Sequence, residues 1–556
     1  GLRPEDFELR VDGKPLPIAF LSRITAGTTE ELNQLSAARK PAGTTITSTS
    51  TESEIRGRTI IFFIDDLHLS APSVQRTRQT ILNFIGNQMG QNDLVAIASA
   101  SGQIGFLQQF TDNKAVLRAA VGRLNHRPYT VIDHENIPMT EYIALRIDQG
   151  DRDAISYYTN QLLATTNFRS PGGGLGPPAG GPVGQASSSQ QQRSSGITRE
   201  LAERQVKERA LVLIKQGTAV TTNTLVSLES LMRSSAKREG RKLVFFISDG
   251  FFLNDRNTGF INKLHELTDA AVRAGVVIYS LDARGLKSTI DVTSNRADPE
   301  GKLSRSTIGE ITASQDALNA LAGDTGGRAL FDSDKLNEAV DQALKETSNY
   351  YLLAWRPSTD EQKSATFKNV EIRIPARPEL QVRIPKGYFL NSPTPPATAQ
   401  NSEPAAKPAE SVVDTDLKRA LSASSLETNV PTTVALTYVD TPDNGPLATA
   451  SVQVAAAVLE YGPDPKQAAV DVAGVILNDA GKAAASFRTR LTVNPISSQP
   501  GSDNGGVIYN YKAKLTPGIY QVRTAVRDEK SGRVGSAAQW IEIPDLSSKK
   551  LTLSSL

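Results

Sequence analysis

The stretch TIIFFIDDLHLS, residues 59–70, decides the fold class of this chain. Its first six residues are all β-branched or aromatic, and two carboxylates, Asp65 and Asp66, follow them directly. A strand that is buried on both faces of a parallel sheet has such an uninterrupted apolar sequence, whereas a strand with one solvated face alternates. The next residues, SVQRTRQTILNFIGNQM, repeat their apolar positions with the period of a helix. The stretch therefore predicts the first strand and the first helix of an α/β domain.

The same strand-then-helix unit recurs along the chain. KLVFFISDG, residues 242–250, is a second apolar strand that ends in a carboxylate, Asp249. In a doubly wound α/β domain the carboxyl ends of the parallel strands meet at one edge, where ligands bind. We therefore predict an α/β domain with a doubly wound, mainly parallel sheet over residues 57–349. Its other predicted strands are 93–100, 276–285 and 329–331, and its other predicted helices are 114–124, 262–275, 316–327 and 335–349.

An insertion at about residues 140–240 interrupts this domain. Residues 140–165 and 198–240 have helical patterns, and the second helix is weakened in its middle by Gly217, Thr218 and the run from Thr221 to Thr224. Between them, Gly, Pro, Ser and Gln make up 22 of the 29 residues from 169 to 197. Such a segment cannot build a core of its own, so we expect a flexible, protease-sensitive loop.

Both flanks of the α/β domain have antiparallel strand patterns. Residues 7–20 alternate around Asp12-Gly13, a dipeptide typical of a tight hairpin turn, and lead into a connector at 25–56. YYLLAW, VEIRIP (370–375) and LQVRIP (380–385) also alternate. We predict that residues 1–56 and 350–390 together form a small antiparallel β-subdomain.

The C-terminal part is predicted to be a separate domain. Residues 391–411 are a Pro/Ala-rich linker. Residues 412–556 contain short alternating segments separated by turns, which is typical of a β-sandwich. The predicted strands are TTVALTYVDT, ASVQVAAAVLEY, KAAASFRTRLTV, GVIYNYKAKL, IYQVRTAVRD and AAQWIEIP.

Composition excludes several classes of function. The chain of 556 residues has 61 basic and 59 acidic residues, so its charge of +2 does not attract nucleic acid. It has no run of about 18 apolar residues, so no transmembrane segment is predicted. The absence of cysteine excludes disulfides and cysteine-ligated metals. Because the first residue is Gly1 rather than Met, we expect a chain that begins inside a longer gene product, from which a signal peptide has been removed.

Residues 1–390 resemble the von Willebrand factor A domain, and more narrowly the VWFA-related proteins of acidobacteria. The likeness rests on the order of several motifs, which are LRPEDFELRVDGKPLPIAF, TIIFFIDDLHLS, KLVFFISDG, LNALAGDTGGRALF, YYLLAW and RIPKGYF. The end of the predicted sandwich, from LTPGIYQVRTAVRD to IEIPDLSSKKLTLSSL, is also similar to the C-terminal part of such proteins. The resemblance implies a von Willebrand A-like fold in a bacterial protein that is secreted or in the cell envelope, either extracellular or periplasmic.

The resemblance also implies a metal-ion-dependent adhesion site. In the family, this site combines D-x-S-x-S after the first strand, a Thr from a later loop and an Asp after a central strand. Short oxygen side chains of this kind can surround Mg²⁺ or Ca²⁺ and leave one position for a carboxylate of a partner. The implied ligands in this chain are Asp66, His68, Ser70, Thr140 and Asp249.

This sequence departs from the family's pattern at its second position. His68 offers an imidazole where a hydroxyl belongs, and a nitrogen ligand suits Mg²⁺ or Ca²⁺ poorly. A register that starts at Asp65 matches neither serine of the pattern. Thr130 is the second candidate for the loop Thr. The site is therefore predicted to be degenerate.

A structural interpretation of the same residues stays open. Asp66 and Asp249 can cap the turns that follow their strands, and His68 can be a hydrogen-bonded histidine without a metal. Ser70 can N-cap the next helix, which has Pro72 in its first turn.

Sequence motifs of enzymes are missing. His265 and His134 each precede a glutamate but lack the second histidine of a zinc protease, and the chain has no G-x-S-x-G motif. A zinc site between His126 and His134 stays open as a minor alternative. We therefore expect a protein that is not an enzyme.

The expected function is binding of a protein or cell-surface ligand by a non-catalytic secreted module, through the degenerate cation site. The alternative is a structural subunit of an extracellular or envelope assembly with a vestigial metal site, which would associate with itself or with other subunits. Cation-dependent binding favours the first function, whereas large apolar contacts between copies favour the second.

Overall fold

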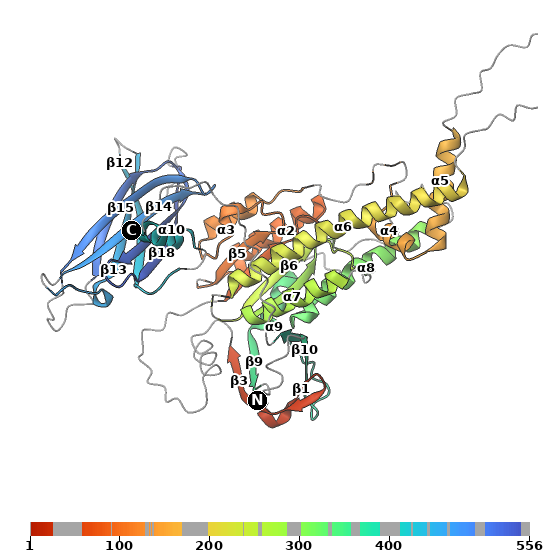
Figure 1. Cartoon of the computed structure of the whole chain (residues 1–556), viewed down its shortest axis with the longest axis horizontal. Helices are drawn as coiled ribbons and strands as arrows, with labels where there is room; N and C mark the ends of the chain where they lie inside the picture. The colour runs from red at the N-terminus through yellow and green to blue at the C-terminus, as the bar shows by residue number, and fades with distance from the viewer. Residues whose placement is uncertain are drawn as a thin grey trace, which may run out of the picture.

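A parallel sheet of five strands forms the centre of the molecule, with strand order β5-β4-β6-β7-β8 (Figure 1). The strands are β4 (Thr59–Ile64), β5 (Leu94–Ser99), β6 (Lys242–Ser248), β7 (Val276–Asp282) and β8 (Ala329–Leu330). The computed structural model describes residues 2–25, 58–90, 92–127, 133, 135, 138–168, 198–236, 238, 240–253, 258–285, 302–331, 336–356, 367–389, 412–423, 426–441, 445–463, 467–494 and 506–545. The expected connector, the Gly/Pro/Ser/Gln-rich loop, the linker, Thr130 and His134 lie outside the described residues.

Helices cover both faces of this sheet, and the burial of β4 shows why its sequence is apolar throughout. Ile60, Phe62 and Ile64 point into one core, whereas Ile61 and Phe63 point into the other. The first core is closed by α2 (Ala71–Asn83), α3 (Lys114–Gly122) and α9 (Leu336–Thr347), and the second by α6 (Arg199–Ser235), α7 (Thr258–Ala274) and α8 (Lys302–Asp324). The predicted α/β class is confirmed.

The insertion forms a helical arm that extends beyond the sheet (Figure 1). Residues 140–165 form two helices, α4 (Glu141–Asp148) and α5 (Arg152–Phe168), because Gly150 takes a left-handed conformation with φ of 90°. By contrast, α6 (Arg199–Ser235) is one continuous helix of 37 residues, about 55 Å long, in spite of the predicted weak middle. Its C-terminal half packs on the sheet, and its N-terminal half shares a separate core with α4 and α5.

The two flanks meet in a β-subdomain, as predicted. The hairpin of β1 (Glu8–Val11) and β2 (Lys14–Leu16) joins β10 (Phe367–Arg373) and β11 (Gly387–Phe389) in the order β11-β10-β1-β2. β3 (Ile18–Thr25) pairs with β9 (Asn349–Trp355) in a second, two-stranded sheet. The prediction of a strand at 380–385 is wrong. This segment docks on the α/β domain instead, where Arg383 pairs with Glu346 at 2.6 Å and Pro385 forms an isolated bridge with Thr325.

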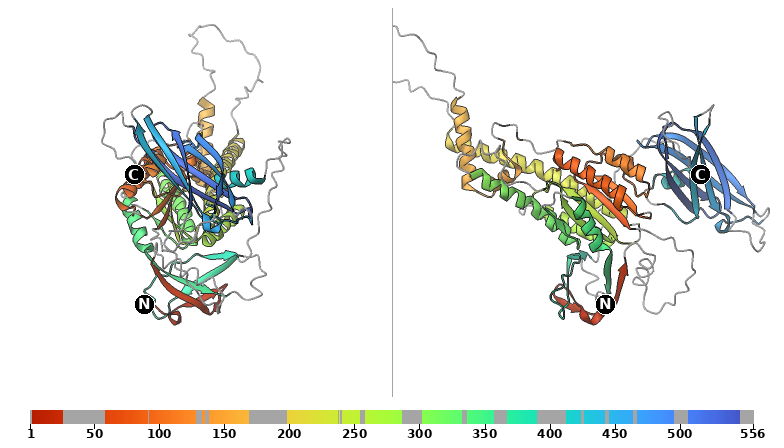
Figure 2. Two further views of the ribbon diagram at one scale, coloured as in Figure 1. Left: turned by 90° about the vertical axis from the view of Figure 1, so that its left-hand side faces the viewer. Right: turned by 180° about the vertical axis from the view of Figure 1, so that it is seen from behind.

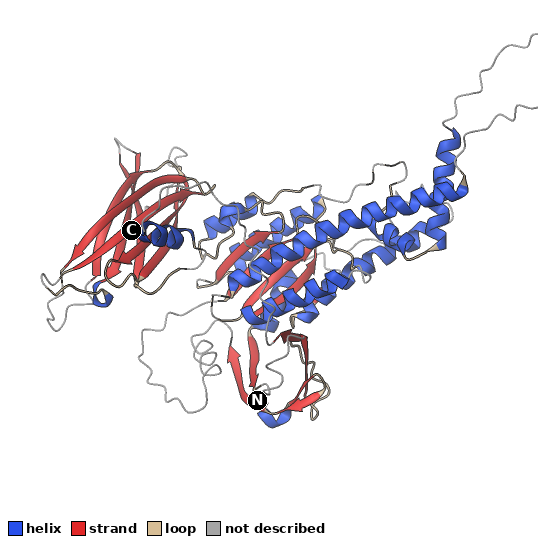
Figure 3. Ribbon diagram, viewed as in Figure 1, coloured by secondary structure: helices blue, strands red, loops and turns tan. Residues whose placement is uncertain are grey.

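The C-terminal domain is a β-sandwich, as predicted. Figure 3 shows its strands in red, and they form two sheets with the orders β12-β13-β16 and β15-β14-β17-β18. The strands are β12 (Thr432–Thr441), β13 (Gly445–Ala455), β14 (Ala468–Asn478), β15 (Ala483–Val493), β16 (Gly506–Lys514), β17 (Gly518–Asp528) and β18 (Val534–Ile543). A helix that the sequence pattern did not indicate, α10 (Val412–Ser422), covers the outer face of β17. None of the described helices has an apolar stretch long enough to cross a lipid bilayer.

The sandwich contacts the α/β domain at α3 and at the segment before it, residues 105–109 (Figure 2). Arg123 forms an ion pair with Asp479 at 2.7 Å, and the rings of Phe106 and Trp540 lie 5.7 Å apart. These contacts place Trp540 at the boundary between the two domains.

Two glycines near the end of α8 provide a test of how this part of the α/β domain packs on β7. A Cβ atom on Gly327 would lie 1.9 Å from the carbonyl oxygen of Ile278 in β7, so Gly327→Ala should lower the free energy of unfolding by roughly 2 kcal/mol or more. Gly323 is exposed in the helix and has open space around it, so Gly323→Ala should raise stability by up to about 1 kcal/mol. Urea unfolding of both variants checks the prediction, and equal effects would contradict the described packing.

Candidate functional site

The two carboxylates after β4 face different neighbours. Asp65 leans toward β6, where it accepts a hydrogen bond from the hydroxyl of Ser248 at 2.7 Å. Asp66 leans toward β5, where it accepts hydrogen bonds from the backbone and hydroxyl of Ser101 and, at 2.5 Å, from the amide of Gln103. The sheet order explains this difference, because β4 lies between β5 and β6. Asp65, rather than the predicted Asp66, therefore faces the central strands.

His68 is held in a buried chain of hydrogen bonds. Its Nδ1 donates to Asp65 at 2.8 Å, and its Nε2 lies 3.3 Å from the hydroxyl of Thr221. Burial lowers the pKa of His68, but the carboxylates of Asp65, Glu141 and Asp249 together raise it more, with Asp65 contributing most, so the net pKa lies above its usual value. His68 is thus an internal hydrogen-bonding group.

The middle of α6 forms the wall opposite His68. Gly217, Thr221 and Thr224 are spaced by four and three residues, so they share one face of the helix. Thr224 donates to Asp65 at 2.9 Å. A Cβ atom on Gly217 would lie 2.1 Å from the carboxyl carbon of Glu141, so the missing side chain makes room for this acid. The residues that weaken the helix pattern are therefore the ones that build the site.

Glu141 is an unusual acid in this position. Burial raises its pKa to about 7, while His68 acts to lower the pKa and Glu310 to raise it further. Glu141 therefore changes its protonation state close to neutral pH, because the effect of burial outweighs that of His68.

The remaining predicted residues cap or join loops. Asp249 accepts a hydrogen bond from the backbone N–H of Ser70 at 2.8 Å, while its second oxygen is buried without a hydrogen-bond partner among the described residues. The hydroxyl of Ser70 lies 2.8 Å from that of Ser73 and does not cap α2. Thr140 caps α4 by accepting from the backbone of Ile143 at 3.3 Å.

In this structure, several of the predicted cation ligands contact other protein groups. Asp66 accepts hydrogen bonds beside β5, His68 uses Nδ1 for Asp65, and Thr140 caps α4. Within the described part of the chain, no group of three or more His, Asp or Glu side chains is placed to hold a metal ion. His126, one of the pair considered for zinc, is exposed.

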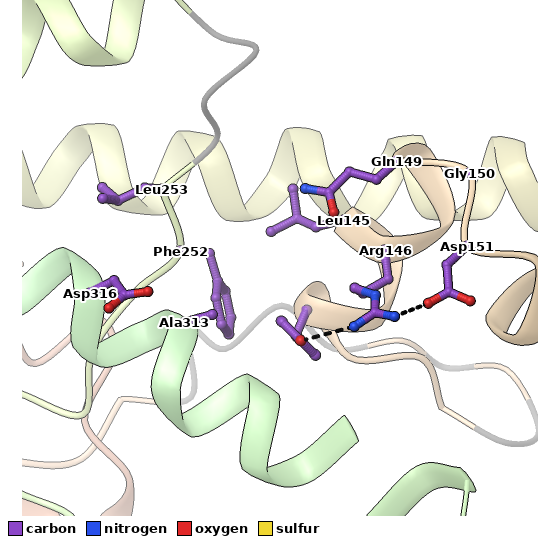
Figure 4. Close-up of a pocket in the computed structure, with 10 residues that line it drawn as sticks. Leu145, Arg146, Gln149, Gly150, Asp151, Phe252, Leu253, Ala313 and Asp316 are labelled. Carbon is purple, nitrogen blue, oxygen red and sulfur yellow. Dashed lines mark hydrogen bonds and ion pairs between the residues drawn. The ribbon is translucent and has the colours of Figure 1, made fainter. Parts of the chain in front are cut away.

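A groove opens beside this network, with a volume of about 740 Å³ (Figure 4). It lies between α4, the middle of α8 and the segment after β6, which carries Phe252 and Leu253. On one side, Arg146 donates hydrogen bonds to Tyr142 at 3.4 Å and to Asp151. On another, Asp316 is exposed on α8. Leu145, Gln149, Gly150 and Ala313 complete the lining.

Several residues of this region were not among the predicted ones. The spacing from Asp65 to the serines does not match the expected pattern, so the sequence favours Asp66 over Asp65. Glu141 directly follows the predicted Thr140, and Thr221 belongs to the run that weakens α6. The available signal in the sequence was the spacing of Gly217, Thr221 and Thr224, which places them on one face of a helix. Small and hydroxyl side chains on one helix face leave room for a polar group of another element.

Comparisons with known proteins leave the family of the chain open. No protein-family model and no curated protein matches it. A β-glucuronidase of Bacteroides uniformis is 13% identical over 20% of this chain and 14% of its own, with a TM-score of 0.15. Northeast Structural Genomics Consortium target SoR45 is 18% identical over 23% of this chain and 96% of its own, also with a TM-score of 0.15. Similarities this weak carry no argument about function.

The raised pKa of Glu141 predicts a pH-dependent stability. Its neutral form contributes stability that is complete below the unfolded pKa of 4.5 and is lost as the pH rises through about 7. The Glu141→Gln variant cannot ionise at this position. Its free energy of unfolding, taken relative to that of the wild type, should therefore increase by on the order of 2 kcal/mol between pH 4.5 and about pH 8. Denaturant unfolding at several pH values measures the difference. The exposed Glu208→Gln is the control, and a flat difference for Glu141→Gln would contradict the assignment.

Proposed function

We propose that this protein is a non-catalytic, von Willebrand A-like binding module of the cell envelope or exterior, which recognises a protein or cell-surface ligand. The groove at the carboxyl end of the sheet is the observation that carries the proposal. Open α/β sheets bind their ligands at this end, outside the carboxyl ends of the strands. The loops there are the part of the fold that can vary without disturbing the core.

The lining of the groove indicates the chemistry of its ligand. Tyr142 and Phe252 are half-buried, and their rings lie 5.9 Å apart. Aromatic side chains in this state supply contact area at little cost in conformational entropy. Asp316 adds a negative charge that is exposed, whereas the charge of Arg146 is neutralised by Asp151. These features suit a ligand that presents an extended peptide segment, with an apolar side chain next to a basic one.

The buried network supports a binding role over a catalytic one. Asp65, His68 and Thr221 are connected like the acid, base and hydroxyl of a nucleophilic enzyme. However, Asp65 is 0% and Thr221 only 1% exposed, so a substrate cannot reach the hydroxyl in this arrangement. The network instead joins β4, β6 and α6 beneath the groove, which keeps the groove walls in place.

Binding through this groove does not need a divalent cation. Its lining differs from the predicted metal ligands, and those ligands are held by protein groups. Recognition is therefore expected to persist when Mg²⁺ and Ca²⁺ are removed. Loss of binding on chelation would support the metal-ion-dependent adhesion site instead.

A second candidate function is that of a structural subunit. The extended α6 carries the apolar side chains of Leu211 and Val212, which are 54% and 55% exposed. Exposed apolar side chains on a projecting helix favour contacts with a second copy or another subunit. A concentration-dependent mass in sedimentation equilibrium, lost in a Leu211→Gln/Val212→Gln variant, would favour this function.

Selection from a displayed library of random peptides tests the groove. We expect the enriched peptides to combine a basic residue with an apolar one. Asp316→Lys and Phe252→Ser should each weaken their binding at least tenfold, which corresponds to about 1.4 kcal/mol, because the first reverses the charge and the second removes the aromatic contact. Fluorescence anisotropy with labelled peptide, with and without EDTA, measures the affinity.

The matched control is Asp112→Lys, which makes the same charge change at an exposed residue outside the groove. Peptides that bind all three variants as tightly as wild type would refute the groove as the recognition site. Melting temperatures of the variants show whether each remains folded.

A further inference from the structure

A further groove opens on the outer face of the C-terminal sandwich, next to the α/β domain. It has a volume of about 840 Å³, which lies within the range of about 300–1,000 Å³ for small-molecule sites. Its floor is formed by β14 and β17, one side by α10, and another side by Phe106 of the α/β domain. The groove proposed above for peptides shares none of its lining residues.

The groove lies between two contacts that the outer face of β17 makes. Side chains alternate between the two faces of a strand, so Gln521, Arg523 and Ala525 lie on the same face. At one end, Gln521 donates to Gln109 of the α/β domain at 2.9 Å. At the other end, Ala525 packs against α10. Arg523 lies between these two contacts, and it is the residue of β17 that lines the groove.

Arg523 is a buried charge without an opposite charge beside it. It is only 8% exposed, and it donates a hydrogen bond to the backbone carbonyl oxygen of Ala423. No described carboxylate forms an ion pair with it, so burial alone acts on its guanidinium and lowers the pKa. Arg527, four residues further along the same face, pairs instead with Asp416 of α10 at 3.1 Å. Because an unpaired buried charge destabilises a fold, an anionic ligand beside Arg523 would relieve this cost.

Apolar side chains form much of the remaining lining. They are half-buried, and they are Phe106, Leu421, Val475 and Leu477. The basic side chains of Lys418 and Arg419 are exposed on α10, where water screens their charges, and Arg419 pairs with Asp416 at 3.3 Å. Recognition of a charge in this groove therefore falls to Arg523, and recognition of an apolar body falls to the four apolar side chains.

We propose that this groove binds a small organic acid, with its carboxylate on Arg523 and its apolar body on Val475 and Leu477. A planar guanidinium matches the two oxygens of a carboxylate, and a hydrogen bond between charged groups is stronger than one between neutral groups. The apolar body removes the half-buried side chains from water. Because Phe106 belongs to the α/β domain and Arg523 to the sandwich, the bound acid contacts both domains.

Calorimetric titration of the full chain with 3-phenylpropanoate tests this site. The matched probes are 3-phenylpropan-1-ol and 3-phenylpropylammonium, which have the same apolar body with a neutral and a cationic head. Inorganic phosphate is the fourth probe, an anion without an apolar body. We expect 3-phenylpropanoate to bind at a single site, at least tenfold more tightly than each of the other three probes.

The first variant removes the buried charge. Arg523→Met should weaken the binding of 3-phenylpropanoate at least tenfold and leave the weak binding of the alcohol unchanged. The melting temperature of the free variant should equal or exceed that of the wild type, because replacing an unpaired buried charge by an apolar side chain removes its desolvation cost. Lys530→Met makes the same charge change at an exposed residue outside the groove, and it should bind 3-phenylpropanoate as the wild type does.

A second pair of variants supplies the missing carboxylate from within the chain. Val475 on β14 lies directly opposite Arg523 in the ladder, so Val475→Glu places a carboxylate beside the guanidinium. This internal acid should weaken the binding of 3-phenylpropanoate at least tenfold. Val475→Gln has the same shape without the charge, so it should bind 3-phenylpropanoate more tightly than Val475→Glu. This comparison decides the question even if Arg523→Met does not fold.

Four results would overturn the proposal. The first is no saturable binding of 3-phenylpropanoate by the wild type. The second is equal affinity for the acid and the alcohol, which would rule out recognition of the carboxylate. The third is phosphate binding as tight as that of 3-phenylpropanoate, which would indicate a site for inorganic anions that does not use the apolar side chains. The fourth is equal binding by Val475→Glu and Val475→Gln, which would place the acid away from Arg523.

Discussion

The carboxylate of Asp65 is the group around which the carboxyl end of the sheet is organised. It is completely buried and accepts hydrogen bonds from Ser248 on β6, Thr224 on α6 and His68 on its own turn. A buried carboxylate costs several kcal/mol unless its oxygens are satisfied. β4, β6 and α6 must therefore meet in one arrangement. This requirement attaches the long helix of the insertion to the sheet and positions the walls of the groove.

The β-subdomain and the proposed groove lie at opposite ends of the sheet for a topological reason. The α/β domain begins with a strand, β4, and ends with a helix, α9. In a doubly wound fold the helices run back against the strands, so both of these ends lie at the amino edge of the sheet. The flanking segments leave and enter there and pair as β3 and β9. The β-subdomain therefore covers the amino edge, whereas the carboxyl edge remains open.

The strands that were predicted and those that were missed differ in what covers them. β4 and β6 were recognisable because both of their faces meet apolar helices. β14 was missed because its pattern does not alternate, although it lies in an antiparallel sheet. Its outer face carries Ala473, which packs against α10. A helix that covers one face of a sheet removes the alternation that a sandwich prediction relies on. The segment 380–385 alternates as a strand does, yet its contacts are with the α/β domain.

The sequence by itself determined the fold class, the three-part organisation and the turn after β4 as a polar site, because hydrophobic period and turn residues act over a few neighbouring positions. It did not determine which carboxylate faces the central strands. Asp65 and Asp66 are adjacent and chemically identical, and only the order of strands decides that one meets Ser248 and the other Ser101. The same holds for Gly217, which weakens a helix locally. The reason for a glycine at this position is visible only in the tertiary structure, where Glu141, distant in sequence, lies against it.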